Sequence, residues 1–342
     1  MPSDSKSKFS LPLFAGVDVG GTNIKVGIVD NDGTIVADTK FPTQADESPE
    51  VSMLMAKDTV SRLLESSSLT WDEVGGVGLG TPGPMDISAG LILTPNNLPG
   101  WRNFPVRERL EHHTGKSVAF SNDASAAAYG EYWIGSGRQY GSLILITLGT
   151  GVGGGIILND LNVEGAHSHG AEVGHITIDT SDRARMCPCG NLGHLEAYAS
   201  ATAVVARCKE ALASGKESIL NKMTGEASPL SALMVSNAGD QGDTLALELI
   251  DETAVYLGNG IATLAHVIDP AAFILGGAMD FGGSKSPLGR RFIDKVIDTV
   301  KKQVFPVIAD RLVVRFAELG GEAGFVGAAG MAKLQYSKNS QN

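Results

Sequence analysis

The chain contains the same short pattern twice: an apolar strand, a glycine-rich turn and a second apolar strand. The first copy surrounds Gly20-Gly21-Thr22-Asn23, and the second runs over residues 143–158 around the glycines of 149–155. Apolar runs that flank a tight turn rich in glycine pair as hairpins. Two copies of one such unit predict a duplicated architecture with a ligand between its halves.

The rest of the chain alternates between the two periodicities of regular structure. Apolar residues at helical spacing predict helices, and short apolar runs bounded by glycine or polar residues predict strands. This alternation places the chain in the α/β class. The last helix is rich in alanine and glycine, which predicts close packing on a neighbour. The predicted helices are 51–66, 106–113, 124–133, 201–213, 244–266, 292–304 and 324–334, and the predicted strands are 14–19, 25–29, 34–40, 73–79, 117–120, 143–148, 156–158 and 273–275.

Composition excludes several classes of protein. With 43% hydrophobic and 19% charged residues, the chain has ample material for a core, which excludes wholesale disorder. A net charge of −11, from 27 basic against 38 acidic residues, lacks the basic footprint of a nucleic-acid binder and disfavours anionic membranes. No apolar run approaches the roughly 18 residues that a membrane helix needs. The length of 342 residues predicts two domains.

The cysteine count and the first residues bear on the compartment. Three cysteines in a chain of this length are no disulfide framework, which predicts a reducing cytoplasm. Residues 1–11 are rich in serine and lysine, and the apolar stretch that follows contains Pro12 and Asp18 without a plausible cleavage site. We therefore expect a disordered tail at 1–11 rather than a signal peptide.

Both glycine-rich turns are candidate phosphate sites. In the first, backbone N–H groups and the Thr22 hydroxyl can approach a phosphate, and Asp18 can hold magnesium beside it; a hairpin turn with a solvated aspartate is an equal alternative. The second formally matches G-x-G-x-x-G, but the strand-like residues 156–158 follow where that dinucleotide fingerprint requires a helix. A hydride-transferring Rossmann enzyme is therefore rejected, and two phosphate turns suggest a nucleotide clamped between domains.

Asn122-Asp123 stands between a predicted strand and a predicted helix. Both residue types are good helix caps, and capping requires the fewest assumptions. The alternative is a general base at a strand-to-helix junction that faces a cleft. The two roles are compatible, because one residue can cap while the other points outward.

The densest cluster of chemical groups joins His175 to Cys187, Cys189 and His194. Two thiols and two imidazoles within about 20 residues form the four-ligand N/S set that zinc favours in a closed structural site. The alternative is two reduced surface cysteines beside solvated histidines. Cys208 lies in a predicted helix and is most simply a core residue.

Taken in chain order, these motifs resemble the ROK family, a group of repressors, open reading frames and sugar kinases. The resemblance runs from about Leu13 to Lys333 and keeps the order of the family's elements. It rests on segments 18–23, 80–84 (Gly-Thr-Pro-Gly-Pro), 94–101, 122–124, 149–155, 172–175, 187–196 and 275–277.

The resemblance implies an actin-like, ribonuclease-H-like duplicated ATPase fold, in which ATP and a sugar meet in a cleft between two domains. It implies that Asp123 is the catalytic base for the primary hydroxyl of the sugar. His175, Cys187 and Cys189 match three of the family's zinc ligands. The implied sugar-binding residues are Gly83, Asn97, Asn122, Asp123, Glu172, His175 and Glu196, and the residues implied for ATP and its Mg²⁺ are Asp18, Gly20, Gly21, Thr22, Asn23, Thr150, Gly151, Gly276 and Gly277.

The sequence departs from the family pattern at two places. The third cysteine of the zinc cluster is His194 here, and zinc accepts imidazole as well as thiolate. The usual Ala-Gly before Glu172 reads Gly170-Ala171, which predicts a small shift of the loop with Glu172 still in place.

From this resemblance we expect an ATP-dependent glucokinase that forms glucose 6-phosphate, with fructose, mannose, allose or N-acetylmannosamine as alternative substrates. A non-catalytic sugar sensor is disfavoured by Asp123 and both phosphate turns. A repressor needs a DNA-binding module before the first strand, and a strand that starts near Leu13 leaves no room for one. We expect a homodimer whose chain divides into a smaller domain, 12–123 plus 325–342, and a larger one, 124–324, which carries the zinc loop.

Overall fold

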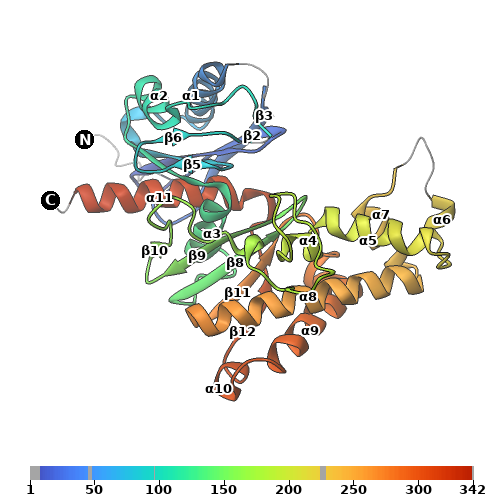
Figure 1. Cartoon of the computed structure of the whole chain (residues 1–342). Helices are drawn as coiled ribbons and strands as arrows, with labels where there is room; N and C mark the ends of the chain where they lie inside the picture. The colour runs from blue at the N-terminus through green and yellow to red at the C-terminus, as the bar shows by residue number, and fades with distance from the viewer. Residues whose placement is uncertain (1–7, 45–47, 96, 224–228, 341–342) are drawn as a thin grey trace. The chain divides into compact units, whose positions relative to one another are not determined.

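The structure is a computed structural model that describes residues 8–44, 48–95, 97–223 and 229–340 (Figure 1). Residues 1–7 of the predicted tail and Asn96 of the 94–101 motif lie outside the described residues. Phe9, near the end of that tail, packs against the hydrophobic core that contains Leu13 and Val17. The Ser10 N–H donates to Asp30 at 3.2 Å.

The first sheet is built from the opening hairpin unit. Its order is β3-β2-β1-β4-β7, with β1 (Leu13–Val19) antiparallel to β2 (Asn23–Val29) and parallel to β4 (Val74–Thr81). The outer strands are β3 (Ile35–Pro42), antiparallel to β2, and β7 (Val118–Asn122), parallel to β4. Three strands joined by tight turns therefore open the chain, as the sequence predicts.

The second sheet repeats this plan. Its order is β10-β9-β8-β11-β12, with β8 (Ser142–Leu148) parallel to β11 (Ala272–Gly276), which is parallel to β12 (Val313–Phe316). The antiparallel side consists of β9 (Val152–Leu158) and the short β10 (Leu161–Asn162). The matching strand orders confirm the predicted duplication and the α/β class. β9 begins inside the predicted turn, because pairing within the sheet holds its glycines in extended backbone although glycine weakens a strand.

Each predicted helix is present, with differences at its ends, whereas the helix Ala232–Asp240 and three short helices were not predicted. α9 begins at Pro287 rather than at residue 292, because Ser286 caps it with a hydroxyl that accepts from Leu288 and Gly289. Within the described residues, none of the helices is both long and apolar enough to cross a membrane. The longer helices are α1 (Pro49–Ser66), α2 (Val106–Thr114), α3 (Asp123–Trp133), α5 (Ala201–Ala213), α7 (Ala232–Asp240), α8 (Thr244–Ile268), α9 (Pro287–Lys301) and α11 (Ala323–Asn339), and the short ones are α4 (Glu196–Ala199), α6 (Leu220–Met223) and α10 (Pro306–Ala309).

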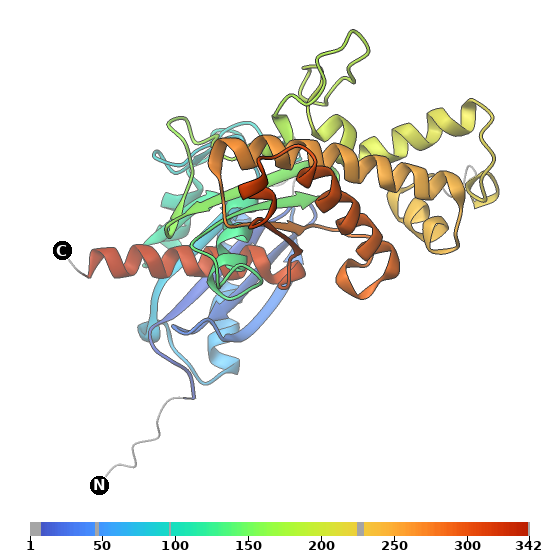
Figure 2. The same cartoon turned by 90° about the horizontal axis from the view of Figure 1, so that it is seen from below.

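Residue contacts divide the chain into two units. The first comprises the residues up to Gln139, Gly155–Ala171 and the residues from Glu318 on; the second comprises Tyr140–Gly154 and Glu172–Ala317. In the second unit, α8 packs against α5, α7 and α9 (Figure 2). The domain boundaries expected from the sequence, after 123 and 324, stay a prediction.

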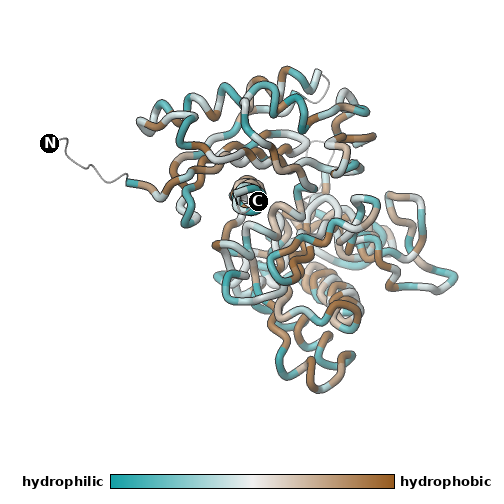
Figure 3. The backbone as a smooth tube through the Cα atoms, turned by 90° about the vertical axis from the view of Figure 1, so that its left-hand side faces the viewer, coloured by the Kyte–Doolittle hydropathy of each residue, from teal (hydrophilic) through white to brown (hydrophobic). Residues whose placement is uncertain are grey.

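Side-chain alternation along β1 builds two cores on the two faces of the first sheet. Leu13, Ala15 and Val17 are fully buried in a core that includes residues of α1 and α2, whereas Phe14 belongs to a second core with Phe325 of α11. The backbone coloured by residue hydropathy shows hydrophobic stretches along the strands of this unit and more hydrophilic residues in the helical segments beside them (Figure 3). The even-numbered positions of β1 therefore face α11, and the last of them is Asp18.

The close approach of α11 depends on glycine. A Cβ at Gly16 would lie 1.8 Å from the carbonyl oxygen of Phe325, and one at Gly327 of α11 would lie 1.6 Å from that of Ala126 in α3. Both obstacles are backbone atoms, which cannot move aside as a flexible side chain can. The predicted packing of the Ala/Gly-rich helix on a neighbour is confirmed on two sides, by the sheet and by α3.

Gly16→Ala is expected to lower the free energy of unfolding by roughly 2–3 kcal/mol or more, because the added methyl group pushes α11 off the sheet. Gly141→Ala is the control, because nothing lies within 4 Å of its added Cβ. Urea denaturation of both variants measures the difference. Equal stability of the two variants would contradict this packing.

Candidate functional site

The first glycine-rich turn is fixed by one hydrogen bond within the turn and by two hydrogen bonds from Thr43. The Gly20 N–H donates to the Asn23 carbonyl at 3.0 Å, which closes the turn between β1 and β2. Thr43, just beyond β3, donates its hydroxyl to the Gly20 carbonyl at 2.7 Å and its N–H to the Thr22 carbonyl at 2.9 Å. These bonds engage carbonyl oxygens of the turn and fix its backbone.

Asp18 lies at the end of β1 in a largely buried position, with its side chain 16% exposed. Burial, together with the nearby charge of Asp123, raises the pKa of Asp18 to about 6, and Lys25 opposes that shift. The Lys25 Nζ lies 4.0 Å from the Asp18 carboxylate and donates to the Gly321 carbonyl at 2.7 Å. A Cβ at Gly324, near the start of α11, would lie 2.3 Å from Asp18 Oδ2, so α11 also confines this carboxylate.

Asn122 and Asp123 stand where β7 passes into α3. The Asn122 Oδ1 accepts the N–H groups of Ala124 and Ser125 at 2.9 and 3.3 Å, so Asn122 is the N-cap. Asp123 is the first residue of α3, and its Oδ1 accepts the Ala124 N–H at 2.8 Å. The capping role is thereby confirmed for Asn122. The electrostatic effect of Asp123 on Asp18 shows that the two carboxylates are neighbours.

Two further contacts join predicted site residues within the first unit. A Cβ at Gly83 would lie 3.9 Å from Asn122 Nδ2, and one at Gly21 would lie 3.1 Å from Asn97 Nδ2. The first unit therefore brings together the phosphate turn, Asp123 and three of the predicted sugar-binding residues, Gly83, Asn97 and Asn122.

The second glycine-rich turn is anchored by residues of the segment 196–202. The Ala201 N–H donates to the Gly149 carbonyl at 2.8 Å, and the Thr202 hydroxyl donates to the Thr150 carbonyl at 2.9 Å. The Val152 N–H donates to Glu196 Oε2 at 2.9 Å. Gly277, with φ of 93°, leaves no room for a Cβ against the backbone of Leu148. The residues predicted for phosphate and adenosine therefore lie close together in the second unit.

The predicted zinc ligands form a compact cluster in the second unit. One potential ligand atom from each of His175, Cys187, Cys189 and His194 lies within 4.8 Å of the others. The Nδ1 of His175 is 3.7 Å from Cys187 Sγ, and the Nδ1 of His194 is 3.2 Å from Cys189 Sγ. Burial raises the pKa of the Cys187 thiol to about 12. A thiolate there requires a cation beside it, which makes this donor set a suitable metal site.

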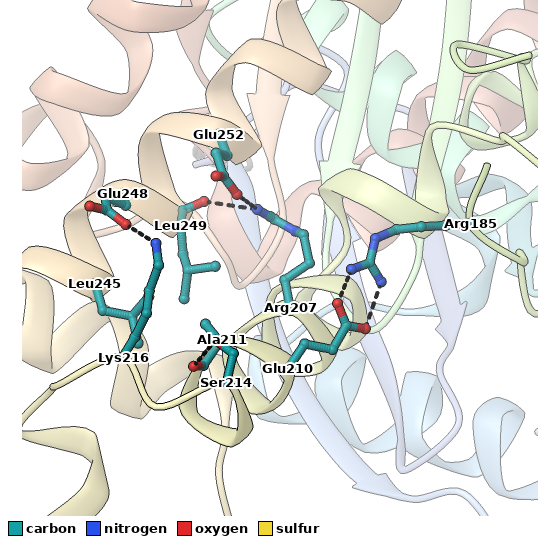
Figure 4. A pocket seen from close by; sticks show the side chains of 10 residues that line it. All are labelled: Arg185, Arg207, Glu210, Ala211, Ser214, Lys216, Leu245, Glu248, Leu249 and Glu252. Carbon is teal, nitrogen blue, oxygen red and sulfur yellow. Dashed lines mark hydrogen bonds and ion pairs between the residues drawn. The ribbon is translucent and has the colours of Figure 1, made fainter. Parts of the chain in front are cut away.

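The loop that carries these four residues, 175–194, is called here the His/Cys loop. It is linked to α4 and α5 through Tyr198, Arg185 and Arg207. The Tyr198 hydroxyl accepts the Arg185 N–H at 2.7 Å and donates to Asp179 at 2.6 Å. The Arg185 side chain makes a two-pronged ion pair with Glu210 of α5 at the edge of a cavity of about 290 Å³ (Figure 4). Arg207, also on this cavity, is 6% exposed and donates to the Tyr198 carbonyl at 3.1 Å.

Glu172 precedes a single turn of 3₁₀-helix that ends at His175, and the His175 N–H donates to the Glu172 carbonyl at 3.0 Å. Glu172 is exposed. Before it, Ala171 adopts φ of 64°, a left-handed conformation that favours glycine, so the departure from the family pattern falls on a strained position. A Cβ at Gly170 would lie 2.4 Å from the Val163 carbonyl oxygen, so that glycine is required.

Sequence reasoning missed the residues that support the site from a distance. Lys25, Thr43, Thr202 and Tyr198 belong to no motif, and each acts on a partner that only the folded chain brings near. The sequence contains a weak signal for Thr202, because it lies two residues after Ser200, whose hydroxyl caps the N-terminus of α5.

Two sheets of the same strand order, each opening on a hairpin with a glycine-rich turn, define an actin-like, ribonuclease-H-like ATPase fold. The model of the ROK family matches residues 14–335. The chain therefore belongs to the ROK family.

Known members of the family are similar along nearly the whole chain. A glucokinase of Halalkalibacterium halodurans is 35% identical, over 94% of this chain and 95% of the relative. The ROK hexokinase of Thermus thermophilus superposes with a TM-score of 0.80 at 29% identity, covering 95% of this chain and 99% of that one. A ROK glucokinase of Streptomyces griseus, solved with glucose and AMPPNP, gives a TM-score of 0.71 at 34% identity, covering 94% and 99%.

Proposed function

We propose that this protein transfers the terminal phosphoryl group of ATP to the 6-hydroxyl of glucose, giving glucose 6-phosphate and ADP. The observation that carries the proposal is the pairing of Asp123 with Asp18 beside the first glycine-rich turn, in a chain 35% identical to a glucokinase. This pair supplies a base for a hydroxyl and a ligand for a cation at one place. ATP and glucose are the two substrates.

Asp123 is the proposed catalytic base. Phosphoryl transfer passes through a loose transition state, so positioning and neutralisation of charge matter more than early proton abstraction. Asp123 holds the attacking hydroxyl in line and takes its proton late. Its Oδ1 already accepts the Ala124 N–H, which orients the carboxylate at the start of α3.

The remaining hydroxyls of glucose are assigned to the other predicted sugar-binding residues. Asn97 and Asn122 lie in the first unit with Gly83; Glu172, His175 and Glu196 lie in the second. Carboxylates, amides and imidazole can each pair with a hydroxyl, and an epimer that leaves one of them unpaired is penalised.

The nucleotide phosphates are assigned to the two glycine-rich turns, with Gly276 and Gly277 beside the adenosine. The residues assigned are Gly20, Gly21, Thr22, Asn23, Thr150 and Gly151. Asp18 is the proposed ligand of Mg²⁺. The fit is chemical: two neighbouring carboxylates, one of them buried with a raised pKa, repel each other, and Lys25 offsets that repulsion only in part, so a divalent cation would stabilise the pair. When bound, Mg²⁺ neutralises charge on the transferring phosphates.

A structural Zn²⁺ is proposed for His175, Cys187, Cys189 and His194. With Nδ1 of His175 facing Cys187, its Nε2 is left for a glucose hydroxyl, so the metal would set both the tautomer and the ring orientation. The thiols must stay reduced to bind it, which is consistent with a cytoplasmic enzyme. The proposed assembly is a homodimer, which the molar mass in solution tests.

A coupled assay of ADP release over a panel of hexoses tests the proposed function. With ATP and Mg²⁺, glucose is expected to give the highest kcat/KM among glucose, fructose, mannose, allose and N-acetylmannosamine. A much higher kcat/KM for another hexose would contradict glucose as the substrate. Sugar binding without ADP release would instead indicate a non-catalytic sugar sensor.

Asp18→Asn is expected to stabilise the fold at high pH while it impairs turnover. The pKa of Asp18 is about 6 in the folded chain against 3.8 as its ordinary value, so ionising it costs folding free energy. That cost is fully present above pH 6, shrinks as the pH falls through 6 and is absent below about pH 3.8. The amide carries no charge and therefore removes this cost. Asp18→Asn should raise the free energy of unfolding by roughly 2 kcal/mol more at pH 8 than at pH 4.

Urea denaturation without Mg²⁺ measures this difference at both pH values. Asp86→Asn is the control of opposite sign, because hydrogen bonds from Ala89 and Ser88 lower the pKa of Asp86. Asp86→Asn should therefore lower the free energy of unfolding more at pH 8 than at pH 4. The same direction of change in both variants would contradict the assignment of Asp18 as a carboxylate strained by burial.

A further inference from the structure

The carboxylate of Glu196 faces two parts of the second unit at once. Its Oε2 accepts the N–H of Val152, in the second glycine-rich turn, at 2.9 Å. Its Oε1 lies 3.7 Å from Cys187 Sγ, at the edge of the His/Cys cluster. Glu196 is also the first residue of α4, whose Ala197 and Tyr198 pack against Cys187. One side chain therefore links the turn assigned to the nucleotide with the loop assigned to the sugar.

The backbone of the turn is shaped around this carboxylate. A Cβ at Gly151 would lie 2.3 Å from Glu196 Oε2, so only glycine admits the contact. The turn has a second, independent anchor in Thr202, whose hydroxyl donates to the Thr150 carbonyl at 2.9 Å. Glu196 thus controls the Gly151–Val152 side of the turn, and Thr202 controls the Thr150 side.

We propose that Glu196 couples the two substrates, so that glucose bound to Glu196 raises the affinity of the second glycine-rich turn for the nucleotide. This inference rests on the proposed function, which assigns Glu196 to the sugar and Thr150 and Gly151 to the phosphates. It adds a positioning role to Glu196 that acts through Val152.

Two physical effects give the coupling its sign. A sugar hydroxyl that donates to Glu196 holds the carboxylate in one rotamer, so the turn has less conformational freedom left to lose when the nucleotide binds. The same hydrogen bond disperses negative charge that would otherwise repel the phosphates. Both effects favour the nucleotide once glucose is bound. Linkage requires that the nucleotide raise the affinity for glucose by the same factor.

Titration calorimetry of the full chain with Mg²⁺ and AMPPNP, without glucose and at saturating glucose, measures the coupling factor as the ratio of the two Kd values. For the unaltered chain we expect a factor of about 5 or more, within the usual range of coupling between sites. In Glu196→Ala the factor should fall to within about twofold of one, and Glu196→Gln should be intermediate, because its neutral oxygen still accepts from Val152 but more weakly.

Two variants serve as matched controls. Thr202→Val removes the other anchor of the turn, so AMPPNP affinity should fall while the coupling factor stays within about twofold of that of the unaltered chain. Glu172→Gln should weaken glucose binding and, once glucose is saturating again, leave the factor in place. An unchanged factor in both Glu196 variants would overturn the inference. Glucose turnover with a coupling factor near one contradicts the inference alone, whereas absence of turnover contradicts the proposed function and the inference together.

Discussion

Replacing Asp123 by asparagine is expected to abolish glucose phosphorylation in a chain that still folds and still binds glucose. The amide keeps the shape of the side chain, and its oxygen can still accept the Ala124 N–H that Asp123 accepts at 2.8 Å. It cannot take the proton of the attacking hydroxyl. Loss of a general base lowers kcat by about 10²–10⁴-fold, and more where positioning fails as well.

Turnover by the coupled assay and glucose affinity by calorimetry measure the two halves of this prediction. Glucose Kd should stay within about tenfold of the original value, since only one hydroxyl contact is changed. Asp243→Asn is the matched control: Asp243 also lies at a helix N-terminus and accepts a backbone N–H, from Ala246 at 2.9 Å, but it belongs to neither substrate site. A kcat of Asp123→Asn close to that of the control would leave Asp123 only a structural role at the start of α3.

The second large effect is expected from the metal. Purified protein should contain one zinc per chain, and His194→Ala should lose it, because three ligands do not complete a closed tetrahedral site. Loss of the metal should weaken glucose binding as well as stability. His175 would lose the group that orients its ring, and the His/Cys loop leads directly into Glu196. Metal analysis by mass spectrometry, with glucose Kd and Tm on the same samples, measures all three quantities.

Two variants separate a zinc site from an ordinary cysteine and histidine cluster. His194→Cys should keep the metal, because thiolate is the ligand that the family uses at this position. Cys208→Ala should keep it too, since Cys208 is a buried residue of α5 outside the cluster. Protein without zinc that still phosphorylates glucose would make His194 a surface histidine and remove the proposed link between the metal and the sugar.

The sequence by itself determined what depends on neighbours along the chain. Strand and helix periodicity is local, so most of the longer helices and strands could be placed within a few residues, although α7 and β12 were not predicted, and the repeated hairpin revealed the duplication. The cap at Asn122 and the grouping of Cys187, Cys189 and His194 also follow from short spacing. His175 is the partial exception, because a loop must fold back to bring it to Cys187.

Only the tertiary structure decided what depends on distant segments. β1 and β7 end at the same edge of one parallel arrangement, and this brings Asp18 near Asp123 and raises the pKa of Asp18. The close approach of α11 to β1 needs Gly16 opposite Phe325, which no local pattern indicates. The bond between Glu196 and Val152 likewise joins residues far apart in the chain. Such contacts depend on how whole sheets and helices pack, because burial, charge and close backbone approach are set by the surrounding elements and not by the residues next in sequence.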